Sequence, residues 1–558
     1  MLVKLAGGRV YDPANGTDGE ARDIYVRDGR IVAKPKGTPD QTFDVTGKVV
    51  MAGAIDLHSH IAGGKMNIAR ALLPEHHAKA HEERTKLRRS GSGHATPTSH
   101  ITGYHYAQMG YTAAFEPAMV PVNTRQAHLE MADIPIIDKG GYVMMGSDDL
   151  LLRMLAAEAS QKQINDYVAW MLHATQAVGI KVVNAGGINA FKFNSRMLDL
   201  DESGPHYGIT PRTILQTLAR AVMELGVPHP LHVHGCNLGV PGNQDTTLRT
   251  IAGIEGLPLH LTHIQFHSYG TEGDRRFSSG AARIAEAINK NKNITTDVGQ
   301  IMFGQTVTAS GDTMAQHQNR GFANPNKWVC MDIECEAGCG LVPFQYRDKN
   351  FVNALQWAIG LEIFLLVDDP WRVFLTTDHP NGAPFTTYPH LIRLLMDRSF
   401  RNDTLAKINK HAAAASALPS LDREYTLYEI AIMTRAAPAR ILGLADRGHL
   451  GAGAAADIVV YTDDADKERM FAKPDLVFKD GVLVARKGEL VAVTWGGTHV
   501  VRPDYDRGIE KSLRTYFDDF LSMRMEHFAF SESELADQNR FHAIVQPCHP
   551  RRDDGGRP

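Results

Sequence analysis

The chain has 558 residues, with 59 basic and 63 acidic side chains and a formal net charge of −4. This balance excludes a basic nucleic-acid-binding surface as the default expectation, so we expect no nucleic-acid partner. A hydrophobic content of 43% and a charged content of 22% exclude disorder or a coiled coil for most of the chain and are typical of a globular protein.

Membrane and secretion signals are not expected. The most apolar stretch, residues 357–367, contains Glu362 and is too short to cross a bilayer, so it predicts a buried helix. No apolar segment precedes Asp12 and Pro13, which argues against a signal peptide. Five cysteines are too few for a disulfide framework. Together these features predict a cytoplasmic protein that does not contact a membrane.

Both ends of the chain have the pattern of short strands. Alternating apolar residues surround Asp28 and Gly29 near one end and Asp480 and Gly481 near the other, and the Asp-Gly dipeptide is typical of tight hairpins. Strands from the two ends can pair into one domain, and the sequence between them then forms an insertion with its own core. We therefore expect a small β-sandwich domain built from residues 1–51 and 447–505.

The middle of the chain, residues 52–446, alternates short β-like runs with helical segments such as 213–225 and 281–289. Eight such strands predict an α/β fold, a (β/α)₈ TIM-like barrel. The expected strands are 49–55, 112–115, 141–145, 180–184, 230–234, 258–264, 294–298 and 373–377. In residues 506–558 we expect a C-terminal helix, 508–525, and a disordered tail at the end of this segment, residues 550–558.

Polar residues at the ends of the expected strands form the candidate site, because the active site of such a barrel lies at the carboxyl ends of its strands. The first strand leads into His58 and His60, and side chains two positions apart on a strand point the same way. With 26 histidines in the chain and a second pair at His232 and His234, a His-x-His pair alone is weak evidence.

The remaining strand ends strengthen this evidence. Lys181 lies in a buried strand, where a cation is costly, so it is either paired or carries a carbamate that could bridge two metal ions. His234 is preferred to His232 because it precedes the loop that enters the site. The complete set of predicted metal ligands is His58, His60, Lys181, His234, His263 and Asp378.

This ordered set resembles the binuclear metal-dependent amidohydrolases. Longer segments are similar to one family among them, which contains the A-type subunit of formylmethanofuran dehydrogenase and the alpha subunit of the formyltransferase/hydrolase complex of methylotrophic bacteria. These segments include residues 58–67 (HSHIAGGKMN), 234–243 (HGCNLGVPGN), 262–270 (THIQFHSYG) and 297–300 (DVGQ).

The resemblance implies two zinc ions, one bound by His58 and His60 and the other by His234 and His263. It also implies that carbamylated Lys181 bridges them, with Lys192 as a rival for that role. Asp378 is expected both to bind metal and to act as the catalytic residue that moves the proton. Weaker candidates for contact with the substrate are Asn67, Arg70, His267 and Gln300.

The resemblance implies a reaction that interconverts the N-formyl group of a furan-type amine carrier, formylmethanofuran or its methylofuran analogue, with formate and the free amine. Hydrolysis to formate in the one-carbon metabolism of a methylotrophic bacterium is the preferred direction, and the other subunits of the complex are the expected partners. Three alternatives stay open: the same subunit in a tungsten or molybdenum formylmethanofuran dehydrogenase, a cyclic-amide hydrolase such as a hydantoinase or dihydroorotase, and a metal-free scaffold.

Overall fold

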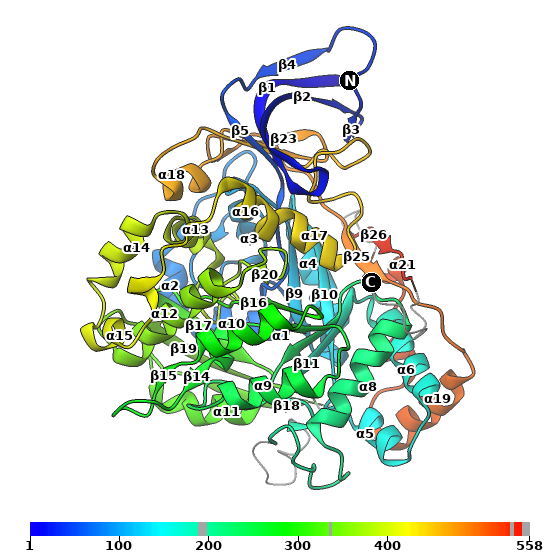
Figure 1. Cartoon of the computed structure of the whole chain (residues 1–558). Coiled ribbons are helices and arrows are strands. Elements are labelled where there is room, and N and C mark those ends of the chain that lie inside the picture. Colours follow the sequence, from blue (N-terminus) through cyan, green and yellow to red (C-terminus); the bar gives the residue numbers. More distant parts are fainter. Residues whose placement is uncertain (188–197, 334–336, 536–540, 550–558) are drawn as a thin grey trace.

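The computed structural model describes the whole chain except residues 188–197, 334–336, 536–540 and 550–558 (Figure 1). Eight parallel strands form a barrel in chain order. It closes where Ser59 pairs with His379 and the N–H of His60 donates to the carbonyl of His379 at 2.7 Å. The predicted TIM-like barrel is thus confirmed. Its strands are β6 (Ala54–Asp56), β9 (Tyr111–Met119), β10 (Asp138–Met145), β11 (Gly179–Val183), β12 (Leu231–His234), β13 (Leu259–Leu261), β16 (Ile294–Asp297) and β20 (Val373–Phe374).

The first expected strand, 49–55, is divided between two sheets. Residues Val49–Ala52 form β5 of the small domain, and the chain then enters the barrel as β6. The two strands are separated by Gly53, where an added Cβ would lie 2.1 Å from Oγ1 of Thr112. The close approach of these two residues explains why glycine stands at the passage from one sheet to the other.

Helices cover the outside of the barrel (Figure 1). The expected helices 213–225 and 281–289 correspond to α8 and α10, and the apolar segment 357–367 lies in α12. Helix α12 is apolar on nearly every side because α10, α13 and α15 pack around it. Among the described residues, no helix is long and apolar enough to span a membrane. The main helices are α3 (Ser99–Gln108), α4 (Thr124–Ala132), α6 (Gln161–Thr175), α8 (Pro211–Glu224), α9 (Gln244–Gly253), α10 (Ala281–Lys290), α12 (Phe351–Leu366), α13 (Tyr388–Met396), α15 (Lys410–Ala414) and α17 (Ala437–Leu442).

The two ends of the chain meet in a nine-stranded sheet, where β5 pairs with β1 on one side and with β21 on the other. Alternation along β5 sends Val50 into the core of the small domain and Val49 toward the barrel. The rings of Phe43 and Phe478, from distant strands, meet with centroids 5.4 Å apart across this core. The strands are β1 (Leu2–Asp12), β2 (Thr17–Arg27), β3 (Arg30–Val32), β4 (Gln41–Asp44), β5 (Val49–Ala52), β21 (Ile458–Tyr461), β22 (Leu476–Lys479), β23 (Val482–Arg486) and β24 (Glu489–Leu490).

Residues 498–501 do not join this small sheet, although they fall within the range 447–505 that we expected in the small domain. They form β25 (Thr498–Val501), which pairs with β10 of the barrel and with β26 (Ala543–Gln546). The N–H of Gly497 donates to Asp138 at 2.8 Å and thereby fixes β25 at this edge. A short apolar strand fits either sheet, so the pattern alone could not choose between them.

The C-terminal segment also departs from expectation. Helix α19 (Ile509–Phe520) ends before residue 525, and the short helix α20 (Met525–Phe528) follows it. Strand β26 lies between the expected helix and the expected disordered tail, and it extends the sheet beside β25. The last nine residues, 550–558, fall outside the described residues.

An insertion between β16 and α12 covers the mouth of the barrel. It consists of α11 (Thr313–Asn319) and a three-stranded sheet, here called the cover sheet, of β17 (Gly304–Ser310), β18 (Val329–Ile333) and β19 (Ala337–Tyr346). The N–H of Ala309 donates to Oδ1 of Asn381 at 2.6 Å, and the hydroxyl of Tyr346 donates to the carbonyl of Asn381 at 3.1 Å. The cover sheet is therefore fastened to the loop that follows Asp378.

Candidate metal centre and active site

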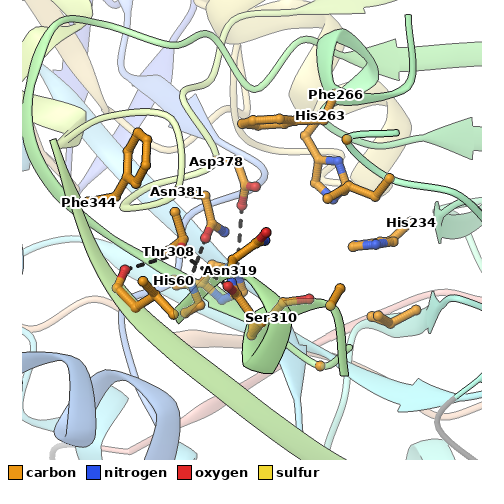
Figure 2. A pocket seen from close by; sticks show the side chains of 18 of the residues that line it. His60, His234, His263, Phe266, Thr308, Ser310, Asn319, Phe344, Asp378 and Asn381 are labelled. Atoms are coloured by element: carbon orange, nitrogen blue, oxygen red, sulfur yellow. Dashed lines mark hydrogen bonds and ion pairs between the residues drawn. The ribbon is translucent and has the colours of Figure 1, made fainter. Parts of the chain in front are cut away.

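A cavity of about 500 Å³ opens at the carboxyl ends of the barrel strands, beneath the cover sheet (Figure 2). Its deep end is lined by residues that lie in or directly after five different strands. All six predicted ligands are among them: His58, His60, Lys181, His234, His263 and Asp378. The structure thus brings together side chains that are up to 320 positions apart in the sequence, from His58 to Asp378 (378 − 58).

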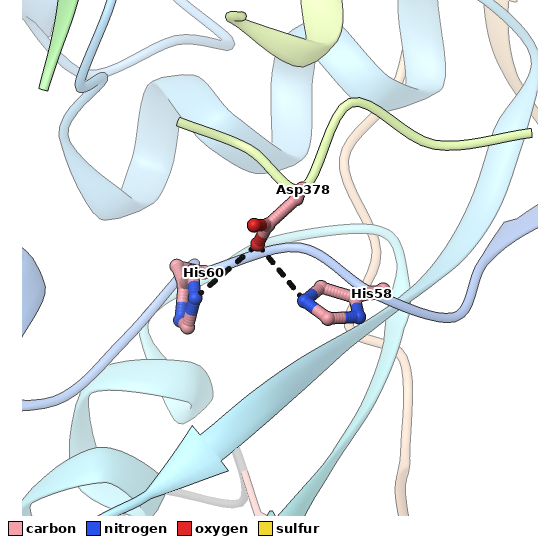
Figure 3. A group of neighbouring side chains, drawn as sticks. All are labelled: His58, His60 and Asp378. Atoms are coloured by element: carbon pink, nitrogen blue, oxygen red, sulfur yellow. Dashed lines mark ion pairs between the residues drawn. The ribbon is translucent and has the colours of Figure 1, made fainter. Parts of the chain in front are cut away.

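Three of these side chains form one compact group (Figure 3). Oδ1 of Asp378 lies 2.9 Å from Nε2 of His58 and 3.5 Å from Nε2 of His60. One ligand atom from each residue lies within 4.8 Å of the others, which suits a single ion. Asp378 reaches this position with a φ of 51°, and its N–H donates to Oγ1 of Thr376 at 2.9 Å.

A second group lies beside the first, where His234 and His263 face each other with ring centroids 4.8 Å apart (Figure 2). The ring centroids of His263 and His58 are 5.5 Å apart. Nε2 of His234 and Nδ1 of His263 are buried and have no hydrogen-bond partner among the described residues. Burial holds the pKa of both histidines well below the ordinary value, so both rings are neutral at pH 7. Buried nitrogen atoms without partners need an explanation, and neutral imidazoles are the form that binds zinc. The donor set therefore fits a metal ion.

Lys181 lines the same cavity, and besides burial its charge acts to lower the pKa of histidines in both groups, His58 in one and His234 and His263 in the other. Its amine donates to Oγ1 of Thr262 at 3.1 Å. Burial lowers the pKa of Lys181 to about 7, although Asp378 and Asp297 act to raise it. A substantial fraction of the amine is thus neutral at pH 7, which is the form that reacts with CO₂. The rival Lys192 lies outside the described residues.

His232, the alternative to His234, lies deeper in the barrel. Its Nε2 is 3.0 Å from Nδ1 of His58, on the side of that ring that faces away from Asp378. The register of β11 and β12 places His232 beside Lys181, and His234 beside Val183 one step closer to the cavity. The structure therefore places His234 at the cavity and His232 beneath His58.

The four weaker substrate candidates occupy other positions. Asn67 donates to Glu130 at 3.1 Å, and Arg70 forms an ion pair with the same carboxylate. Gln300 is buried and donates to the carbonyls of Ile301 and Trp357 at 2.8 and 3.0 Å. None of these three lines the described part of the cavity. The contacts of Asn67, Arg70 and Gln300 instead hold the loops around the site.

His267 lies closer to the predicted ligands than the other three candidates. Its ring contacts those of His263 and His234, with centroids 5.4 and 5.5 Å away. Both of its ring nitrogens are buried without a hydrogen-bond partner among the described residues. It therefore packs behind the His234 and His263 pair.

Two buried carboxylates that sequence reasoning did not select contact two of the predicted ligand histidines. Oε1 of Glu116 lies 2.9 Å from Nδ1 of His60, and Oδ2 of Asp297 lies 3.1 Å from Nδ1 of His58. Glu116 interrupts the largely apolar strand β9, and this is the signal by which it could have been found, whereas Asp297 ends the short strand β16, in which two of the four residues are threonines. Such contacts fix the ring orientation of metal-binding histidines.

Lys65 is the third residue that the sequence did not single out, although it lies within the segment 58–67. It is 4% exposed and lines the cavity. Its amine has no hydrogen-bond partner in the part of the chain that the structure describes. Burial lowers its pKa, while Glu116 and Asp378 act in the opposite direction. An unpartnered amine in a cavity is a ready donor to an anionic ligand.

The outer part of the cavity is more apolar. Phe266 and Phe344 face it from opposite sides, and the cover sheet adds the hydroxyl groups of Thr308 and Ser310 (Figure 2). Phe322, which also lines the mouth, is 71% exposed. An apolar entrance above a polar, charged floor suits a ligand with an aromatic body and a small polar head.

Comparison with known proteins agrees with this architecture. The model of the amidohydrolase family matches residues 41–491. The A-type subunit of the formyltransferase/hydrolase complex Fhc of Methylorubrum extorquens is 44% identical over 538 residues, which cover 96% of this chain and 97% of that protein. The protein FwdA of Methanocaldococcus jannaschii is 40% identical over 555 residues, which cover 95% of this chain and 97% of FwdA.

The crystal structure of the FhcABCD complex of M. extorquens with methylofuran contains a chain of the same fold. It superposes with a TM-score of 0.93 at 43% identity and covers 98% of this chain and 100% of that chain. The family model and these relatives match most of the chain, not only a short segment of it. The chain therefore belongs to the amidohydrolase family and, within it, to the group formed by FwdA and the A-type subunits of formyltransferase/hydrolase complexes.

Proposed function

We propose that this chain is the hydrolase subunit of a formyltransferase/hydrolase complex and that it hydrolyses the N-formyl group of a furan-type amine carrier to formate and the free amine. The observation that carries the proposal is the convergence of four histidines, one lysine and one aspartate on a single cavity. The full-length likeness to the A-type subunit of Fhc supports the choice of substrate and of partner subunits.

The site would hold two zinc ions, one at His58 and His60 and the other at His234 and His263, with Asp378 as a further ligand. When bound, zinc lowers the pKa of a water molecule and polarises the formyl oxygen. Lys181, with its pKa near 7, is the proposed carbamylated residue. The carbamate changes a possible cation into an anion, which suits a position between two dications.

Asp378 is the proposed proton carrier. In the hydrolysis a C–O bond forms between water and the formyl carbon, the C–N bond breaks, and one proton must reach the departing nitrogen. Asp378 lines the cavity beside His58 and His60, so it can take a proton from the water and return it to the amine. Lys65 can donate hydrogen bonds to the formate that is left.

Two alternatives are distinguished by experiment. The 40% identity to FwdA keeps open an assembly with a tungsten or molybdenum formylmethanofuran dehydrogenase. A cyclic-amide hydrolase has only local support, since the dihydroorotase of Solibacter usitatus is 44% identical over 64 residues, or 11% of this chain. The buried ring nitrogens without partners disfavour a metal-free scaffold.

The test is to purify the native complex, identify its subunits, and assay it on N-formylfurfurylamine, hydantoin and dihydroorotate. The proposal predicts a co-purifying formyltransferase and formate release from the formyl amine alone. Co-purification of a molybdopterin protein would favour the dehydrogenase assembly. Activity on a cyclic amide, without activity on the formyl amine, would overturn the proposal.

A further inference from the structure

One buried carboxylate, Asp297 at the end of β16, contacts both halves of the site. Oδ2 lies 3.1 Å from Nδ1 of His58, and Oδ1 accepts the backbone N–H of His263 at 2.7 Å. His58 and His263 belong to the two different groups of predicted ligands, and their ring centroids lie 5.5 Å apart. Asp297 is fully buried and does not line the cavity, so it does not touch the substrate.

The contact with His58 determines which nitrogen of that ring carries the proton. Nε2 of His58 faces Asp378 and the cavity, so a metal ion there needs the lone pair of Nε2 and leaves the proton on Nδ1. Oδ1 of Asp297 accepts the N–H of His263, and Oδ2 faces ring nitrogens of both His58 and His260, so Asp297 acts as an acceptor and favours the tautomer with the proton on Nδ1 of His58. Nε2 of His260, 3.0 Å from the same Oδ2, donates to Asp297 and fixes the carboxylate in turn.

Two further histidines extend the same pattern beneath the site. Nε2 of His232 lies 3.0 Å from Nδ1 of His58, and Nδ1 of His232 lies 2.9 Å from Nε2 of His229. With the proton of His58 on Nδ1, that N–H faces both Oδ2 of Asp297 and Nε2 of His232, so His232 carries its own proton on Nδ1 and donates to His229. The row of rings alone fits either direction of donation, and the carboxylate of Asp297 selects the direction that leaves Nε2 of His58 free.

The contact with His263 fixes a backbone rather than a ring. His263 has a φ of 36°, in the left-handed region that side-chain-bearing residues rarely adopt. Its N–H is held by Asp297, and Gly299 leaves room for its side chain, since a Cβ at Gly299 would lie 2.4 Å from Cβ of His263. Asp297 and Gly299, at the end of β16 and just after it, therefore determine the direction in which the His263 side chain points.

We infer that Asp297 is the positioning residue that couples the two halves of the metal site, because it orients the ring of His58 and the backbone of His263 with one carboxylate. This inference rests on the proposed function, since it takes His58 and His263 as metal ligands. Loss of the carboxylate should therefore weaken metal binding at both groups of ligands.

The decisive variant is Asp297→Asn in the full chain within its complex. The amide has the size of the carboxylate, but its NH₂ group must face either the donors of His58 and His260 or the N–H of His263. We expect metal affinity, measured by competition with a chelator, to fall about 10- to 100-fold. We also expect the visible spectrum of the cobalt-substituted protein to change, and kcat to fall more than KM rises.

Thr296→Val is the matched control. Thr296 is buried on the same strand, and its hydroxyl donates to the carbonyl of Leu261 at 2.6 Å and to no predicted ligand. This variant should keep the metal affinity and cobalt spectrum of the wild type. If Asp297→Asn does not fold, His260→Leu removes one donor to the carboxylate and should give a smaller change of the same kind in the cobalt spectrum.

The outcomes separate the inference from the function on which it rests. If the wild-type protein binds two metal ions and Asp297→Asn has the same metal affinity and cobalt spectrum, the positioning role is overturned and the proposed function is not. If Asp297→Asn does not fold, an unchanged spectrum in His260→Leu has the same consequence. Wild-type protein that binds no zinc or cobalt overturns the proposed function, and the inference with it.

Discussion

Glu116 and His60 form a buried pair, with Oε1 of the carboxylate 2.9 Å from Nδ1 of the ring. The other oxygen, Oε2, accepts the backbone N–H groups of Ile61 and Ala62 at 2.8 and 3.2 Å. Burial raises the pKa of Glu116, but His60 and Lys65 oppose this and bring it to about 2. A single carboxylate therefore holds both the His60 ring and the start of the loop that follows it.

Glu116→Gln should disturb both the contact with the His60 ring and the contacts with the backbone of the following loop. The amide keeps one accepting oxygen, but its NH₂ group must face either the ring or the two backbone donors. We expect the free energy of unfolding to fall by about 1–3 kcal/mol and the zinc content to fall as well. Urea unfolding and elemental analysis measure the two effects. Glu362→Gln is the control, because Glu362 is buried and accepts from Ala417 far from the site. It should lose stability but keep zinc, and equal zinc in both variants would contradict the role of Glu116.

Lys65 and Lys139 are both buried, but only the amine of Lys139 has hydrogen-bond partners among the described residues. The amine of Lys139 donates to the carbonyls of Ile134 and Gly496 at 3.2 and 3.0 Å, whereas the amine of Lys65 has no partner among the described residues. Lys139→Met should lower the unfolding free energy by about 1–3 kcal/mol, since two carbonyls lose their donor. Lys65→Met should leave stability unchanged or higher.

Lys65→Met should instead change the binding of anions. We expect inhibition by formate to become at least about tenfold weaker, which corresponds to the loss of about 1.4 kcal/mol from a charge-assisted hydrogen bond. Inhibition constants for formate in wild type, Lys65→Met and Lys139→Met measure this. Equal constants in all three proteins would show that Lys65 does not contact the product.

Carbamylation of Lys181 should depend on pH. Its pKa of about 7 in the metal-free site lies below the ordinary value, so the reactive neutral amine predominates above pH 7 and falls tenfold for each pH unit below it. Reactivation of metal-free protein by zinc should therefore need bicarbonate and should slow as the pH falls from 8 to 6. Lys181→Gln should bind less zinc and show no bicarbonate dependence. If zinc reactivates the wild-type protein at the same rate with and without bicarbonate, Lys181 is not carbamylated.

Asp378→Asn should separate metal binding from proton transfer. The amide preserves the shape of the side chain beside His58 and His60 but cannot carry the proton. We expect zinc to be retained and kcat to fall by about 10²- to 10⁴-fold. Formate release and zinc content on the same preparation measure this. Near-normal turnover in the variant would show that another group carries the proton.

Much of this arrangement follows from the strand pattern. Because a parallel barrel gathers the carboxyl ends of its strands, His58, Lys181, His234 and Asp378 could be expected to meet before their contacts were known. The order along the chain also favoured His234 over His232, since His234 precedes the loop that enters the site, and His234 does line the cavity. The pairing of Lys181 with His232 gives the physical reason, because it places His232 deeper in the barrel than His234.

The residues that support the ligands could not be predicted in the same way. Glu116 and Asp297 act through contacts with rings from other strands, and a lone acid in a strand has many possible partners. Asn67 and Arg70 show the reverse case, since their position in a segment typical of the family suggested substrate contact, while their side chains bind Glu130. The spacing of residues along the chain does not show which distant side chains meet in the folded structure.

The measurement that tests the central claim most directly is anomalous diffraction at the zinc edge from crystals of the native complex. The account predicts two peaks for each copy of this chain, one beside His58 and His60 and one beside His234 and His263, with added density on Nζ of Lys181 between them. No peak in this cavity, or zinc bound only elsewhere on the chain, would contradict it.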